Sequence, residues 1–135
     1  MKTVTIVSDD RVGLLADVSY ILGKSNINID ALCVEVINGK AIIAMGVKDP
    51  KKTSTVLQSN GFKTTGEDAI VIKVSNNAVA DIREMLEQEK VLVKQFNTIS
   101  SNDKDTIYAL EVDKPRKASK MLGSFILGGL LPPSL

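Results

Sequence analysis

The residues best suited to bind a ligand follow the first apolar run of the chain. Asp9, Asp10 and Arg11 come shortly before Gly13, and the apolar positions after Gly13 recur at helical spacing. A loop that leads into a helix presents unpaired backbone N–H groups, which suit a carboxylate, and a glycine lets a ligand come close to the backbone. The carboxylate of Asp9 or Asp10 can pair with an ammonium group. This loop is therefore a candidate site for a small molecule that carries both charges.

Two asparagines after the same expected helix form the second candidate group. Asn26 and Asn28 flank Ile27 and offer amide donors and acceptors at the start of the next expected strand. These amides could bind the same small molecule as the loop. In the alternative interpretation, Asp10 only caps the helix, Gly13 only allows close packing, and the asparagines only form turns.

The chain lacks the residues that many catalytic and metal sites require. It contains no histidine and one cysteine, Cys33, which excludes zinc sites built on thiolates or imidazoles and any histidine-based triad. The carboxylates of Asp9, Asp10 and Asp17 are near in sequence, but Asp17 falls one helical turn beyond the loop and forms no acid–base pair with them. We therefore expect no catalytic residue, no metal and no cofactor. Cys33 is expected to be a small core residue.

Composition limits the size and class of the protein. The chain has 135 residues, with 17 Lys and Arg against 16 Asp and Glu, and 44% of its residues are hydrophobic. This is the composition of a globular protein with one ordinary domain or two small ones. The near-neutral charge and the few aromatic residues disfavour a nucleic-acid partner. No apolar run reaches the roughly 20 residues that cross a bilayer, and no secretory signal precedes the first strand, so we expect a cytoplasmic protein without a membrane partner.

The sequence repeats itself with a shift of 64 residues. Residues 15–18 (LADV) match residues 79–82 (VADI), and the register continues without a gap into the following apolar positions. After one inserted residue, residues 47–52 (VKDPKK) face residues 112–117 (VDKPRK). Agreement over both halves indicates a duplication. The basic residues in the second pair of segments fall at expected helix starts, where they are either solvated charges or part of a partner-binding face.

Each half predicts the order strand, helix, strand, strand, helix, strand. In the first half the expected strands are residues 2–7, 27–37, 40–48 and 62–65, and the expected helices are residues 14–23 and 50–60. In the second half the expected strands are residues 69–74, 91–100 and 106–112, and the expected helices are residues 78–89 and 115–122. The dipeptide Asn38-Gly39 favours a two-residue hairpin turn, and Pro50 favours a helix start.

This order describes an α+β protein made of two ferredoxin-like βαββαβ units. Each unit would have an antiparallel sheet covered by helices on one face. We expect a first domain over residues 1–66 and a second over residues 67–135, joined by a short polar turn. The sequence does not decide whether the second domain has a last strand, because glycines and prolines interrupt the tail at 123–135. Its apolar residues could extend the helix, pair as an edge strand or fray.

The run from Asp10 to Val18, D-R-V-G-L-L-A-D-V, followed by the segment N-I-N-I at 26–29, resembles the ACT domain, a small amino-acid-sensing regulatory fold. The resemblance covers residues 3–65 well and residues 69–123 more loosely. It implies a βαββαβ unit, side-by-side pairing of sheets between domains, and a small effector at the interface near the first loop. On this basis the expected ligand-binding residues are Asp9, Asp10, Arg11, Val12, Gly13, Leu14, Asn26, Ile27 and Asn28.

The second half departs from this pattern at the corresponding loop. Ser75-Asn76-Asn77 replaces the Asp-Arg-Val-Gly stretch, and the loop is about three residues shorter. Asn76 and Asn77 form a second candidate site, with helix capping as the alternative role. We expect the second domain to be mainly structural.

These observations predict a regulatory or sensor protein that is not an enzyme. The expected partners are an amino acid or similar small effector, a second copy of the chain in a homo-oligomer, most simply a dimer, and a separate regulated enzyme. The alternative is a ligand-free interaction module that regulates a separate enzyme or transcription factor through its sheet edges or open face.

Overall fold

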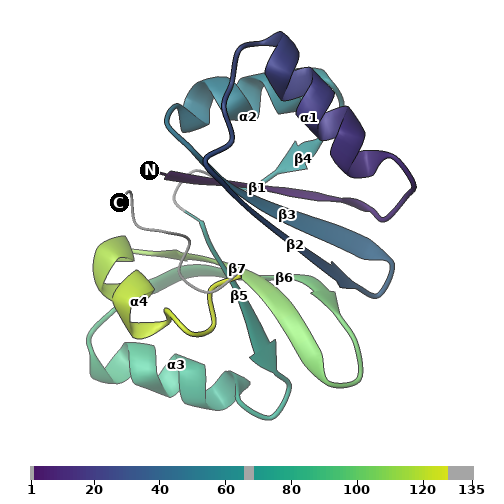
Figure 1. The fold of residues 1–135 in the computed structure, drawn as a ribbon. Coiled ribbons are helices and arrows are strands. Elements are labelled where there is room, and N and C mark those ends of the chain that lie inside the picture. Colours follow the sequence, from purple (N-terminus) through teal and green to yellow (C-terminus); the bar gives the residue numbers. More distant parts are fainter. Residues whose placement is uncertain (1, 66–68, 128–135) are drawn as a thin grey trace. The chain divides into compact units, whose positions relative to one another are not determined.

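The computed structural model describes residues 2–65 and 69–127, which form two compact units. The first unit holds residues 2–65 and the second holds residues 69–127. In each unit, two helices cover one face of an antiparallel sheet (Figure 1). The predicted α+β class and the ferredoxin-like order of elements are confirmed.

The first unit is built around a four-stranded sheet. Its elements are β1 (Lys2–Asp9), α1 (Leu14–Lys24), β2 (Ala31–Ile37), β3 (Lys40–Val47), α2 (Pro50–Ser59) and β4 (Lys63–Thr64). The strand order β2-β3-β1-β4 places β2 at one edge. Asn38 and Gly39 join β2 to β3 with φ values of 50° and 75°, which confirms the predicted hairpin turn.

The core of the first unit lies between this sheet and the two helices. Leu14, Val18 and Leu22 are spaced four residues apart, so they share one face of α1, and all three are buried. They pack with Leu57 of α2 and with alternate residues of β1 and β3. Figure 1 shows α1 and α2 side by side over the sheet. This packing fixes both ends of α1, where the candidate binding residues lie.

The start of β2 differs from the expected strand. The sequence predicts a strand from residue 27, but β2 begins at Ala31. Ile27 and Ile29 nevertheless pack against the core of the first unit. The apolar alternation at residues 27–29 therefore reflects burial of a connecting segment. It does not produce a strand, because a strand also requires a neighbouring strand to pair with.

The two helices of the first unit begin in different ways. The alternative role of Asp10 as the cap of α1 is wrong: Gly13 is the residue before the helix, and no side chain accepts a hydrogen bond from its first turn. At α2, the Asp49 carboxylate accepts a hydrogen bond from the Lys52 N–H at 3.1 Å, and Pro50 is the first helical residue, as predicted.

The second unit has the same order of elements as far as its second helix, with a three-stranded sheet. Its elements are β5 (Ile70–Ser75), α3 (Val79–Gln88), β6 (Val93–Ser101), β7 (Asp105–Val112) and α4 (Pro115–Met121). The strand order is β5-β7-β6. The pairing of β6 with β7 is interrupted twice, between Val93 and Gln95 and between Thr98 and Ser100. These irregularities distort the edge that β6 presents.

The segment after α4 pairs with β5. Lys73 donates its N–H to the Phe125 carbonyl at 2.9 Å, Leu127 donates to the Val71 carbonyl at 3.0 Å, and Ile72 forms an antiparallel bridge with Ile126. Of the three alternatives for the tail, edge pairing therefore holds for residues 125–127. The remainder of the predicted tail, residues 128–135, lies outside the described residues.

Candidate functional site

The loop between β1 and α1 exposes most of the predicted binding residues. Gly13 has a φ of 82°, a left-handed conformation that glycine adopts without strain. A Cβ atom at this position would meet nothing within 4 Å, so the backbone conformation requires glycine and close packing does not. Val12 beside it is fully exposed, whereas Leu14 is only 4% exposed and anchors the loop in the core.

The two aspartates of the loop have different surroundings. Asp9 forms an ion pair with Lys40, which faces it across the end of the β1–β3 pairing. The hydrogen bond from Lys40, helped by its charge, lowers the pKa of the Asp9 carboxyl. Asp10 donates its backbone N–H to the Gly39 carbonyl at 2.9 Å, and its side chain has no hydrogen bond or ion pair within residues 2–65 and 69–127. Asp10 therefore supplies the uncommitted carboxylate of the loop.

Arg11 is engaged with the first turn of the helix that follows. Its guanidinium lies 2.8 Å from the Asp17 carboxylate, and both side chains are about half exposed. The pair lines a shallow pocket of about 220 Å³ together with Tyr20. An exposed pair of this kind contributes little to stability. It keeps the Arg11 side chain close to α1.

The first turn of α1 has free backbone donors. The Leu14 N–H donates to the Arg11 carbonyl at 3.3 Å and the Asp17 N–H to the Gly13 carbonyl at 2.9 Å. Between them, the N–H groups of Leu15 and Ala16 have no acceptor in the described part of the chain. Uncapped donors at a helix start suit an anionic group.

The predicted asparagines lie at the opposite end of α1. Asn26, with a φ of 58°, follows the helix, and together with Ile27 and Asn28 it lines a pocket of about 190 Å³ whose other wall includes Lys48 and Lys52. An α-helix rises 1.5 Å per residue, so the 11 residues of α1 separate this pocket from the β1–α1 loop by roughly 16 Å. Within one unit, the two candidate groups do not meet.

The second candidate site has a structural use in the second unit. The Asn76 amide donates to the Asn102 carbonyl at 3.0 Å and accepts from the Thr106 hydroxyl at 2.6 Å. The alternative role as a helix cap is wrong, because Ala78 precedes α3 and no side chain accepts from its first turn. Asn77 is exposed. Asn76 thus fastens the turn between β6 and β7.

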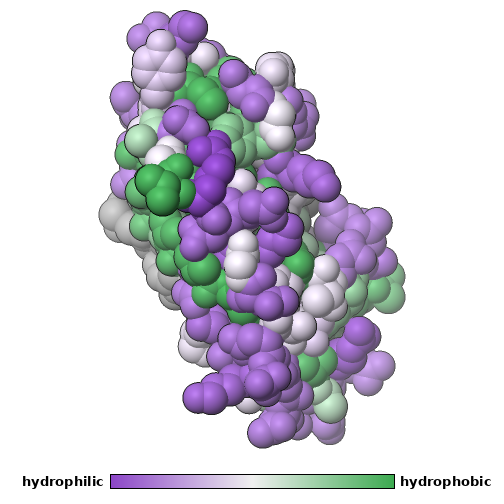
Figure 2. All heavy atoms as spheres, turned by 90° about the vertical axis from the view of Figure 1, so that its right-hand side faces the viewer, coloured by the Kyte–Doolittle hydropathy of each residue, from purple (hydrophilic) through white to green (hydrophobic). Residues whose placement is uncertain are grey.

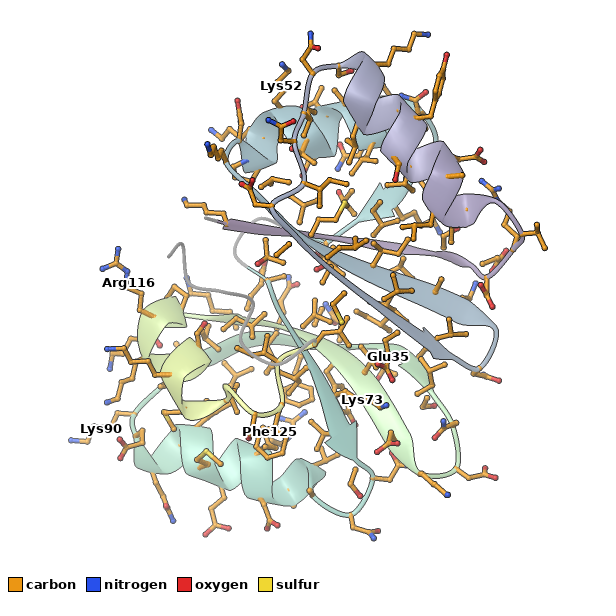
Figure 3. All side chains as sticks on the ribbon, viewed as in Figure 1. Glu35, Lys52, Lys73, Lys90, Arg116 and Phe125 are labelled. Atoms are coloured by element: carbon orange, nitrogen blue, oxygen red, sulfur yellow. The ribbon has the colours of Figure 1, made fainter. Side chains whose placement is uncertain are left out.

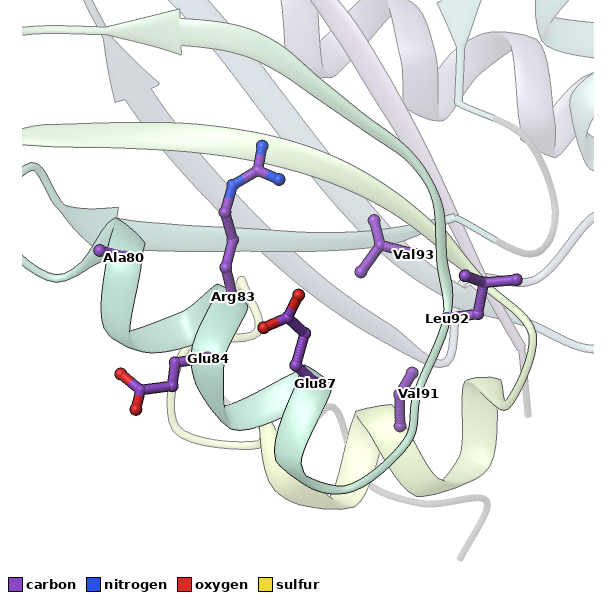
Figure 4. Close-up of a pocket in the computed structure, with 7 residues that line it drawn as sticks. All are labelled: Ala80, Arg83, Glu84, Glu87, Val91, Leu92 and Val93. Atoms are coloured by element: carbon purple, nitrogen blue, oxygen red, sulfur yellow. The ribbon is translucent and has the colours of Figure 1, made fainter.

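A larger groove in the second unit was not predicted from the sequence. It has a volume of about 740 Å³ and lies between α3 and the start of β6 (Figure 4). Arg83 projects from α3 with its guanidinium 4.2 Å from the centre of the Phe96 ring, and Leu92 on the opposite wall is 63% exposed. The spacing of Arg83, Glu84 and Glu87 on one helix could have indicated one wall of this groove. The opposite wall comes from a different element, which the sequence alone does not bring next to α3.

The edge strand β2 carries an exposed apolar stripe. Leu32, Val34 and Val36 are 44%, 43% and 52% exposed. They pair in register with Met45, Ile43 and Ala41, which are core residues, so the stripe lies on the helix-covered side of the sheet but beyond the helices. Figure 2, which faces the β1–α1 loop and the β2–β3 hairpin, shows apolar side chains exposed among polar ones. Cys33, on the other face, is half-buried, and burial raises the pKa of its thiol.

Within the described residues, no three His, Cys, Asp or Glu side chains are grouped so that they could hold a metal ion. Among the same residues, no helix is long and apolar enough to span a bilayer.

Comparison with known proteins identifies the fold. No protein-family model and no curated protein matches the chain. A solved structure from Bacteroides thetaiotaomicron matches at 25% identity, covering 90% of this chain and 85% of that chain, with a TM-score of 0.50. The ligand-free regulatory subunit of aspartate kinase from Thermus thermophilus matches at 12% identity, covering 89% of both chains, with a TM-score of 0.46. The small subunit of acetolactate synthase from Thermotoga maritima matches at 16% identity, covering 90% and 84%, with a TM-score of 0.41.

At these identities the likeness concerns the fold and not the ligand or the partner. The order of elements and the antiparallel sheets agree with the resemblance that the D-R-V-G-L-L-A stretch carries. The chain therefore has the ferredoxin-like fold that its sequence predicts.

Proposed function

We propose that this chain is a non-enzymatic regulatory protein that binds a small amino acid. The supporting observation is the β1–α1 loop, which holds an uncommitted carboxylate on Asp10 and uncapped N–H groups on Leu15 and Ala16. The helix donors suit the carboxylate of an amino acid, and Asp10 suits its ammonium group.

The site is completed by a neighbouring domain in this proposal. Because α1 separates the loop from Asn26 and Asn28 within one unit, a small ligand cannot reach both groups in a single copy. It reaches both only if the loop of one copy meets the asparagines of a second copy. We take residues 1–66 and 67–135 as the two domains, with the second domain mainly structural. A ligand held between domains stabilises the state in which both walls are present, so its binding is coupled to assembly.

The assembly we propose is a homodimer formed through β2. This strand is regular over seven pairs with β3, ends its sheet and carries the stripe of Leu32, Val34 and Val36. A regular edge with exposed apolar side chains is a template for pairing with another strand. Two-fold pairing of β2 with its own copy is the simplest closed arrangement.

The same stripe supports the alternative function. If a separate cytoplasmic enzyme or transcription factor covers β2, the chain is an interaction module that needs no effector. The two candidate functions differ in their response to amino acids, which gives a direct test.

The test is a thermal-shift screen of the full chain against the proteinogenic amino acids. We expect one amino acid, or a related group, to raise the melting temperature, since a ligand stabilises the state that binds it. Gly13→Val is expected to abolish this shift, because valine disfavours the left-handed backbone and blocks approach to the helix start. Gly61→Val is the matched control: Gly61 has a φ of 85°, follows α2 and carries the same conformational penalty in a turn that is not part of the β1–α1 loop. Binding that survives Gly13→Val would contradict the site, and no response to any amino acid would favour the interaction module.

A further inference from the structure

We propose that the effector is an acidic amino acid, whose side-chain anion is bound by Lys48 and Lys52 in the pocket beside Asn26 and Asn28. This inference rests on the proposed function and adds the chemical class of the ligand. The pocket belongs entirely to the first unit and is lined by Asn26, Ile27, Asn28, Lys48, Asp49 and Lys52. Figure 3 shows Lys52 on α2 near the segment that follows α1.

The protein balances only one of the two positive charges in this pocket. The Asp49 carboxylate, the one acidic group in the lining, accepts the hydrogen bond of the Lys52 backbone N–H and is committed to the helix start. The ammonium groups of Lys48 and Lys52 have no hydrogen bond or ion pair within the described residues. The lining therefore offers two cations and two side-chain amides, all of which can donate to an anion.

The position of Lys52 is locally unfavourable. Lys51 and Lys52 lie in the first turn of α2, which contains no acidic residue. Cations at a helix start oppose the helix dipole, and such conflicts between local preference and structure are typical of functional sites. An anion held between Lys48 and Lys52 would relieve the conflict.

The duplicated half provides an internal comparison. Lys117 corresponds to Lys52 in the repeat, and its ammonium group donates to the Glu89 carbonyl at 2.8 Å. Lys114 donates to the Lys90 carbonyl at 2.9 Å. In the second unit, lysines at the start of α4 thus bond to the carbonyls at the end of α3. In the first unit, the Lys52 ammonium makes no such bond and is left for another acceptor.

The ligand class follows from combining the two walls. The β1–α1 loop of one domain suits the ammonium and carboxylate that every amino acid carries. The pocket of the other domain then receives the side chain, and two ammonium groups with two amides select a carboxylate or a phosphate there. Aspartate, glutamate and phosphoserine have this chemistry, whereas their neutral counterparts lack it.

The experiment compares probes that differ in one charge. Binding of L-aspartate, L-asparagine, L-phosphoserine, L-serine and succinate to the full chain is measured by calorimetry at matched ionic strength. We expect an acidic amino acid to bind about tenfold more tightly than its neutral counterpart, since a charge pair near the surface is worth roughly one to a few kcal/mol. Whether aspartate or phosphoserine is preferred distinguishes a carboxylate from a phosphate ligand.

Three lysine variants test the pocket. Lys48→Met and Lys52→Met are each expected to reduce the acidic preference by roughly three- to tenfold. Lys51→Met is the matched control, because Lys51 is exposed in the same helical turn but does not line the pocket. It removes the same net charge and should leave the preference unchanged.

The outcomes separate the two proposals. Equal binding of aspartate and asparagine, unchanged in all three variants, would overturn the acidic class and leave amino-acid binding intact. Binding of succinate alone, weakened by Lys52→Met, would support the anion pocket and contradict the amino-acid site. If none of these probes binds while another amino acid raises the melting temperature in the thermal-shift screen, the acidic class fails and the proposed function stands.

Discussion

A charge placed at the centre of β2 tests whether this edge holds two copies together. Val34 is the middle residue of Ala31–Ile37, so in a two-fold pairing centred on the strand it lies opposite its own copy. Val34→Lys would place two lysines against each other there. Because Val34 is 43% exposed in the chain described above, the variant should fold.

The expected loss of dimer stability in Val34→Lys follows from the exposed fraction of the Val34 side chain. Full burial of a valine side chain is worth about 1.5–3 kcal/mol, and 43% of that surface remains to be buried in a dimer. The loss is then about 1 kcal/mol per copy, or about 2 kcal/mol per dimer. Repulsion between two lysines in opposing positions adds about 1 kcal/mol near the surface. A total of about 3 kcal/mol weakens the dimer by roughly a hundredfold.

Sedimentation velocity over a range of concentrations measures this change, and circular dichroism checks the fold of each variant. Thr98→Lys is the control, since it adds the same charge to an exposed position of the irregular edge strand β6. We expect Val34→Lys to dissociate the dimer and Thr98→Lys to leave it intact. A wild-type chain that stays monomeric, or a Val34→Lys dimer as stable as the wild type, would refute the assignment of β2.

Two further predictions concern the carboxylates at the ends of β1 and β3. Asp49→Ala should lower the free energy of unfolding by about 1 kcal/mol in urea titrations, because the Lys52 N–H loses its cap, whereas Asp10→Ala should change it little, because Asp10 caps no helix. A comparable loss for both variants would contradict this difference. The pKa of Asp9 is lowered by Lys40, so the ion pair favours folding above the ordinary carboxyl pKa and this contribution is lost as the pH falls through the lowered value. In a carboxyl NMR titration, Lys40→Met should raise the pKa of Asp9, and an unchanged value would show that Lys40 does not cause the shift.

The sequence predicts local turns well because the residues that form them are adjacent. Asn38-Gly39 and Pro50 carry their own backbone preferences, and the structure confirms the turn and the helix start that they favour. The start of β2 is harder to predict from the sequence, because Ile27 and Ile29 show the alternation of a strand without having a strand beside them.

The role of each loop carboxylate depends on contacts that the local sequence does not contain. Asp9 faces Lys40 because of the register between β1 and β3, and 31 residues separate the two in sequence. The left-handed Gly13 occupies the cap position of α1, so Asp10 does not have the capping role of its alternative interpretation. The pocket of Lys48 and Lys52 likewise needs the end of α1 to meet the start of α2. A single sequence suggests such residues, but it does not show which of them lie next to each other in the fold.

The unequal edges of the two sheets limit how many copies can join. In the described residues, β4 has only two residues, β5 is partly paired by residues 125–127, and β6 is irregular. The strand β2 alone is both long and regular. If copies of a chain pair through a single sheet edge, assembly ends at two copies. Two such edges on each chain would allow open-ended filaments. In the proposed dimer, the irregular pairing of β6 would leave no second regular edge to which a further copy could add.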